Sequence, residues 1–103
     1  MALTAGIEKG TLGATIATIF TSAGTSLVIS FLVTNTDVVA RPVNLKYVDG
    51  STHIWILDPA KSLAAGVCEN WLWGRVVVPN TKLIEAGSDA AGVVHYALSW
   101  VAI

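Results

Sequence analysis

The segment Val43–Leu57 reads VNLKYVDGSTHIWIL and decides the fold class. Apolar and polar side chains alternate over Val43–Val48, and a second extended run follows at Thr52–Leu57. Alternation with a period of two is typical of a β-strand, because successive side chains point to opposite faces. Asp49-Gly50 lies between the two runs, and this dipeptide favours a tight turn whose twist matches that of paired strands. The segment therefore predicts an antiparallel β-hairpin.

The same signals continue on both sides of this hairpin. We predict further strands at Ala14–Phe20, Ser26–Thr34, Val67–Trp73, Arg75–Val78, Lys82–Glu85 and Val93–Ile103, with Lys61–Gly66 as a loop or a short strand. Turn residues separate these runs about every 8–12 residues, a spacing typical of sandwiches and barrels. The sequence therefore predicts an all-β fold. We expect one domain over residues 1–103, a single antiparallel β-sandwich, jelly-roll-like or Ig-like, of about seven to eight strands.

Two of these strands have faces that can be assigned. Ser26–Thr34 reads SLVISFLVT, and simple alternation places Leu27, Ile29, Phe31 and Val33 on one face. In Val93–Ile103, alternation places Val94, Tyr96, Leu98, Trp100 and Ala102 together. The opposite faces hold, in the first strand, Val28, Ser30, Leu32 and Thr34 and, in the last strand, Val93, His95, Ala97, Ser99 and Val101.

The composition points to assembly with other proteins. Hydrophobic residues make up 53% of the 103-residue chain and charged residues only 13%, whereas ordinary domains carry about 25% charged residues. Four tryptophans add to the apolar content. A domain of this size has a thin core, so we expect part of the apolar surface to lie in a protein–protein interface. The alternative is a well-filled core under a Thr, Ser and Asn surface.

Charge and hydropathy argue against several partners. The formal net charge is −1, and the Lys and Arg residues are dispersed singly, so no basic stripe indicates nucleic acid. The longest apolar stretch, Leu27–Val33, is far shorter than the ~20 residues of a spanning helix, so we expect no membrane partner. The N-terminal MALTAGIEKG has no basic region followed by an apolar run, so we expect no secretory signal peptide.

The residues with reactive side chains form no recognisable catalytic or metal motif. Cys68 and His95, with an aspartate, are the residue types of a nucleophile and its base, but no catalytic signature surrounds Cys68. We expect Cys68 to be a buried or half-buried thiol that packs as a small apolar residue. His53 and His95 lack the third ligand that zinc normally takes. We therefore expect no enzyme activity, no metal and no cofactor.

Trp71 and Trp73 are the first candidates for a functional surface. In an extended strand, residues two apart point to the same face, so the two indoles would lie side by side. With Trp55 they form the predicted protein interface, because tryptophan is enriched among interface residues that dominate binding. Two alternatives stay open. The tryptophans fill the core with Trp100, or Trp71 and Trp73 form a stacking platform for sugars. The polar groups near that platform are Glu69, Asn70 and Arg75.

Taken together, the segments resemble a group of small virion proteins of tailed bacteriophages with a β-sandwich or jelly-roll-like fold. The resemblance covers Ala14–Ile103 and lies in the order of the segments ATIATIFTSAG, SLVISFLVTNTD, VNLKYVDGSTHIWIL, LAAGVCENW, KLIEAGSDAAG and VVHYALSWVAI. The sequence departs from the pattern at Cys68, Trp71 and Trp73, where plainer aliphatic or polar residues are expected.

The resemblance implies a structural protein of the virion, made in the host cytoplasm. Its implied form is a homotrimeric capsid decoration (cement) protein, whose partners are other copies of itself and the major capsid protein or another virion protein. A tail, collar or fibre-base component is the close alternative. From a different class, the alternative is a carbohydrate-binding module built on Trp71 and Trp73.

Overall fold

The computed structural model describes residues 4–56, 61–70 and 76–103. All regular elements in these ranges are β-strands, which confirms the all-β prediction. They are β1 (Ala5–Thr11), β2 (Ala17–Thr21), β3 (Ser26–Asn35), β4 (Arg41–Asp49), β5 (Thr52–Trp55), β6 (Lys61–Leu63), β7 (Cys68–Asn70), β8 (Val76–Val78), β9 (Leu83–Gly87) and β10 (Val94–Ala102).

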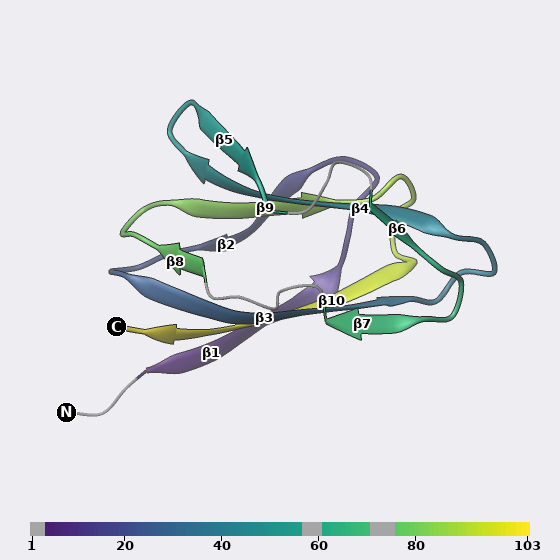
Figure 1. The fold of residues 1–103 in the computed structure, drawn as a ribbon, viewed down its shortest axis with the longest axis horizontal. Helices are drawn as coiled ribbons and strands as arrows, with labels where there is room; N and C mark the ends of the chain where they lie inside the picture. Colours follow the sequence, from purple (N-terminus) through teal and green to yellow (C-terminus); the bar gives the residue numbers. More distant parts are fainter. Residues whose placement is uncertain (1–3, 57–60, 71–75) are drawn as a thin grey trace.

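The strands form two antiparallel sheets that pack as the layers of a sandwich (Figure 1). Sheet I has the order β1-β10-β3, and both β7 and β8 pair with β3 at its far edge. Sheet II has the order β2-β9-β4, and both β5 and β6 pair with β4. Because β5 and β6 both pair with β4, and β7 and β8 both pair with β3, the strand order is that of an eight-position jelly roll. The sandwich prediction is therefore confirmed.

The hairpin that decides the fold class is confirmed. Asp49 of β4 pairs with Thr52 of β5, so the loop between them consists of Gly50 and Ser51. Gly50 has φ of +59°, a conformation that glycine adopts without steric cost. Glycine at the first central position is the requirement of a type II′ turn, whose twist suits two paired strands.

A hydrophobic core lies between the two sheets. Its buried members are Leu12, Phe20, Val28, Phe31, Val33, Val43, Leu45, Leu63, Val78, Ile84, Ala86, Val94 and Leu98. On β10 the residues predicted to share one face lie on the inner side, since Val94 and Leu98 are buried and Tyr96 and Trp100 pack against the core. The rings of Phe20 in sheet II and Trp100 in sheet I lie 5.6 Å apart, which ties the two layers together.

The predicted faces of β3 are wrong in its first half. The register between β3 and β10 shifts at Ser99/Trp100, where Ser99 pairs with Ser30 and Trp100 pairs with Val28. Ile29 is therefore the extra residue of a β-bulge, and the alternation of side chains changes phase there. As a result Val28 and Phe31 are both buried, whereas the side chain of Ile29 is 47% exposed.

Candidate interaction surface

The outer side of sheet I carries a row of apolar residues that crosses four strands. The register pairs Ala5 of β1 with Val101 of β10, Val101 with Leu27 of β3, and Leu27 with Val77 of β8. Residues directly opposite in neighbouring strands have their side chains on the same face. Leu27 lies between the buried residues Ser26 and Val28, so this face points away from the core.

Further apolar side chains extend the row into a patch. Ile7, Ile29, Leu32 and Val77 are 60%, 47%, 43% and 50% exposed. We define the outer apolar patch as Ala5, Ile7, Leu27, Ile29, Leu32, Val77 and Val101. Between the first row and Leu32, the register pairs Ile7 with Ser99 and Ser99 with Ser30, so two serines interrupt the patch. Leu32 lies opposite Ala97, in a row that reaches the charged residue Lys9 on β1. A gathering of exposed apolar side chains on one face makes it a candidate site of interaction.

The outer side of sheet II carries a row of paired charged and polar side chains that ends at a tryptophan. In one row across the sheet, Glu85 of β9 accepts a 3.5 Å hydrogen bond from Thr18 of β2 and lies 3.5 Å from Lys46 of β4. The Nζ of Lys46 lies 5.4 Å from the ring centroid of Trp55 on β5. The two outer faces of the sandwich therefore differ, since exposed aliphatic side chains gather on sheet I and this row of sheet II is mainly charged.

The tryptophans predicted as an interface are only partly placed. Trp55 is 42% exposed on sheet II, so it is available for contact and does not fill the core. It lies on the opposite sheet from the outer apolar patch. Trp71 and Trp73 lie outside the described residues. Trp100 packs against the core, so the alternative in which the tryptophans fill the core holds for Trp100 and not for Trp55.

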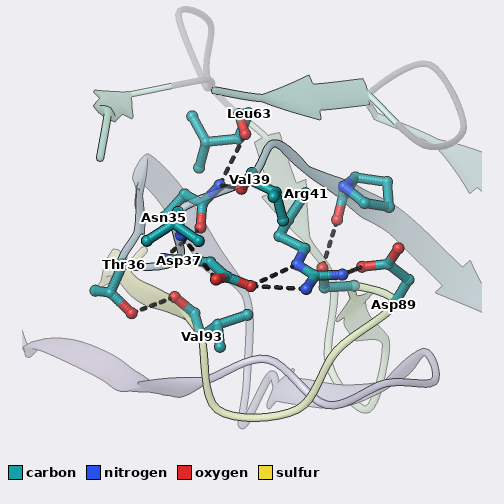
Figure 2. Close-up of polar contacts among 11 residues, drawn as sticks. Asn35, Thr36, Asp37, Val39, Arg41, Leu63, Asp89 and Val93 are labelled. Atoms are coloured by element: carbon teal, nitrogen blue, oxygen red, sulfur yellow. Dashed lines mark hydrogen bonds and ion pairs between the residues drawn. The ribbon is translucent and has the colours of Figure 1, made fainter. Parts of the chain in front are cut away.

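The loop between β3 and β4 is held by one buried side chain. Asn35 has no exposed surface, and its Nδ2 donates to the backbone oxygens of Val39 at 2.9 Å and Leu63 at 3.0 Å. Its Oδ1 accepts from the backbone N–H of Asp37 at 2.9 Å. Figure 2 shows the amide of Asn35 inside the turn that it closes. These bonds tie the end of β3 to the loop that follows it and to the end of β6.

A charged cluster continues this bracing toward the surface. The Oδ2 of Asp37 lies 2.8 Å from Nε of Arg41, and Arg41 also approaches Asp89 at 3.4 Å (Figure 2). The hydrogen bonds from Arg41 and from the backbone N–H of Val38 hold the pKa of Asp37 below its usual value. Between these residues Val38 is 89% exposed. The loop thus exposes the apolar side chain of Val38 on a backbone that the hydrogen bonds of Asn35 and Asp37 hold in place.

The candidate reactive residues do not form a catalytic arrangement. Cys68 is exposed, so the prediction of a buried or half-buried thiol is wrong. The thiol is exposed because Cys68 lies on β7, a three-residue strand at the edge of sheet I. Cys68 and His95 both pair with Thr34, from opposite sides. Two strand spacings, roughly 10 Å, therefore separate the backbones of Cys68 and His95. His53 lies on the other sheet, sheet II.

The described residues also contain no built ligand site. Within residues 4–56, 61–70 and 76–103, no three His, Cys, Asp or Glu side chains are grouped as metal ligands, and no pocket is found in this part of the chain. None of these residues belongs to a helix that is long and apolar enough to cross a membrane.

Comparison with solved structures places this jelly roll beside phage proteins. A pentameric capsid protein isolated from metagenomic phage sequences, solved by iodide phasing, superposes with a TM-score of 0.52 at 14% identity, over 91% of this chain and 60% of that protein. The structural neighbours are phage capsid proteins. A second crystal structure of such a pentameric protein gives a TM-score of 0.49 at 16% identity, over 91% and 59% of the two chains.

The comparison shows a shared fold and sets its extent. This chain spans about three fifths of the length of the capsid proteins that it matches, with 60% and 59% of them covered. No protein-family model and no curated protein matches the sequence. The neighbours are described as pentameric, whereas the sequence resemblance implies a trimer.

Proposed function

We propose that this chain is a structural protein of a phage virion, and that it acts through contacts with copies of itself and with the capsid. The observation that carries the proposal is the fold shared with a phage capsid protein over 91% of the chain. The outer apolar patch supports the mode of action, because a surface of this kind is stabilised when another protein covers it.

The proposed role is mechanical and needs no catalytic group. Burial of apolar surface supplies roughly 25 cal/mol per Å², and an interface of standard size buries about 1,600 Å² in total. The lost freedom of the associating molecules removes a large part of this gain. Each contact is then modest in strength, but a shell carries many copies, so their contributions add up to resistance against the pressure of packaged DNA.

In its specific form, the protein is a decoration (cement) protein that covers a seam between major capsid protein subunits as a homotrimer. The order of the sequence segments supports this form. A ring of five copies is the second form, favoured by the pentameric state of the structural neighbours. In both forms the outer apolar patch of sheet I serves contacts between copies. Trp55, together with Trp71 and Trp73, serves the contact with the capsid platform.

The experiment that tests the role compares virions with and without the protein. We expect purified virions to contain the chain in many copies, and virions that lack it to release DNA at a lower temperature and after milder low-salt treatment. Complementation with the wild-type chain restores DNA retention. Virions that lack the protein and retain DNA as well as the wild type would contradict the cement role. Absence of the chain from purified particles would contradict the virion role itself.

A further inference from the structure

Within the described part of the chain, strand β1 has one side whose backbone groups pair with no other strand. It pairs with β10 alone among the described strands. The register between β1 and β10 has no shift. At one end of it the N–H of Ala102 donates to the oxygen of Thr4, and at the other end the N–H of Leu12 donates to the oxygen of Val94. Even-numbered residues therefore direct their backbone groups toward β10, because hydrogen-bonded pairs alternate in an antiparallel ladder. The outward-directed residues are Ala5, Ile7, Lys9 and Thr11.

The other described edge strands are shorter or irregular. On sheet II, the register of β2 shifts between Thr18 and Phe20, and β5 and β6 have four and three residues. On sheet I, β7 and β8 at the edge opposite β1 have three residues each. Bulges and short edge strands are the usual means by which proteins prevent strand pairing. By contrast, β1 runs for seven residues without a register shift, and Figure 1 shows it at the margin of its sheet.

We propose that β1 pairs antiparallel with β1 of a second copy, which continues sheet I across a two-fold axis. An open strand edge requires another strand as its partner, because a strand alone supplies donors and acceptors at the matching spacing. Among the described edge strands of this chain, β1 is the longest and its register has no shift, so a second β1 matches it in length. This contact goes beyond the proposed virion role and is additional to any ring of copies.

Charge selects the register of this pairing. Full overlap of the two strands would place Glu8 directly opposite Glu8 of the second copy, and like charges in that position are destabilising. A shift of two residues keeps outward-directed residues opposite one another. It places Ile7 opposite Ile7 of the second copy, and Lys9 opposite Ala5 of the second copy. Ala5 and Ile7 belong to the outer apolar patch, so this register joins the patches of the two copies into one surface.

Cysteine crosslinking tests both the pairing and its register. In a Cys68→Ser background, Ile7→Cys would be compared with Ala5→Cys, which lies on the same edge and face. Opposed hydrogen-bonded residues have Cα atoms about 5.5 Å apart, within the range that a disulfide bridges. Two copies of residue 5 would lie about 13 Å apart along the strands, which exceeds that range.

The expected result is a disulfide-linked dimer that forms rapidly with Ile7→Cys and at least tenfold more slowly with Ala5→Cys. Equal rates for the two variants, or no crosslinked dimer with Ile7→Cys, would overturn the proposal. Neither outcome would affect the virion role, which is tested on particles.

Proline at an outward-directed position provides a second, independent test. The N–H of Lys9 has no partner within the sheet register of the subunit, so Lys9→Pro leaves the pairing with β10 intact but blocks the edge. Lys9→Ala is the matched control, because it removes the charge and keeps the N–H. We expect Lys9→Ala to dimerise like the wild type. Lys9→Pro, folded by circular dichroism, should lose the dimer in light scattering. Equal dimerisation of the two folded variants would overturn the proposal.

Discussion

Gly6 on β1 lies directly beneath the indole of Trp100 on β10. A Cβ atom at residue 6 would lie 2.6 Å from Cζ2 and 2.8 Å from Cε2 of that ring. The glycine therefore makes room for the indole on the inner side of sheet I, where it reaches Phe20 of the opposite sheet. An edge glycine covered by a cross-strand aromatic ring is a known device for fixing strand register.

Gly6→Ala should displace the Trp100 ring and destabilise the fold. Overpacking of this kind costs about 1–3 kcal/mol in the free energy of unfolding. Gly10→Ala is the matched control on the same strand, because a Cβ there would lie 3.6 Å from the Tyr96 ring, an ordinary contact. The free energy of unfolding in urea measures both variants. An equal loss for the two glycines would contradict this account of Trp100.

Asn35→Ala should destabilise the protein more than the loss of an exposed hydrogen bond does. The substitution leaves the oxygens of Val39 and Leu63 without the Nδ2 donor, and each buried group left unpaired costs about 1–3 kcal/mol. Asn80→Ala is the control, since Asn80 accepts one exposed bond from the N–H of Gly24. Chemical denaturation measures the difference, and similar losses for both variants would show that Asn35 does not hold the loop.

Acidification should weaken the β3–β4 loop through Asp37. The pKa of this carboxyl is lowered from 3.8, first by the hydrogen bond from Arg41 and then by the N–H of Val38. A lowered pKa in the folded state means that the stabilisation is present above pH 3.8 and is lost as the pH falls below it. We expect the thermal midpoint of the wild type to fall more between pH 6 and pH 3 than that of Asp37→Asn. Equal falls would contradict a role for the ionised carboxylate.

The sequence predicts those parts of the fold that depend on local chemistry. The β4–β5 hairpin follows from Asp49-Gly50, and the inner face of β10 follows from uninterrupted alternation. The sequence does not reveal β1, because its residues AGIEKGT include two glycines and two charges and lack the apolar run of a strand. That strand is held by its pairing with β10, which lies about ninety residues away, at the other end of the 103-residue chain.

The candidate surface depends on contacts that no local pattern contains. The phase change at Ile29 arises from a bulge opposite Ser99, and it exposes Ile29 while Phe31 and Val33, predicted on the same face, are buried. The row from Ala5 to Val77 joins four strands that are distant in sequence. Asp37 and Arg41 are four residues apart, but their partner Asp89 is brought to them by the fold. The composition indicates an apolar surface, and only the topology locates it on sheet I.

The most direct test of the central claim is the solution mass of the chain and of two matched variants, measured by light scattering at several concentrations. Ile29 in the outer apolar patch and Ile54 on sheet II are 47% and 54% exposed, so Ile29→Glu and Ile54→Glu introduce the same charge at similar exposure. The account predicts a homo-oligomer for the wild type and for Ile54→Glu, and a smaller mass for Ile29→Glu. A wild type that is monomeric at every concentration, or equal masses for both variants, would contradict assembly through sheet I.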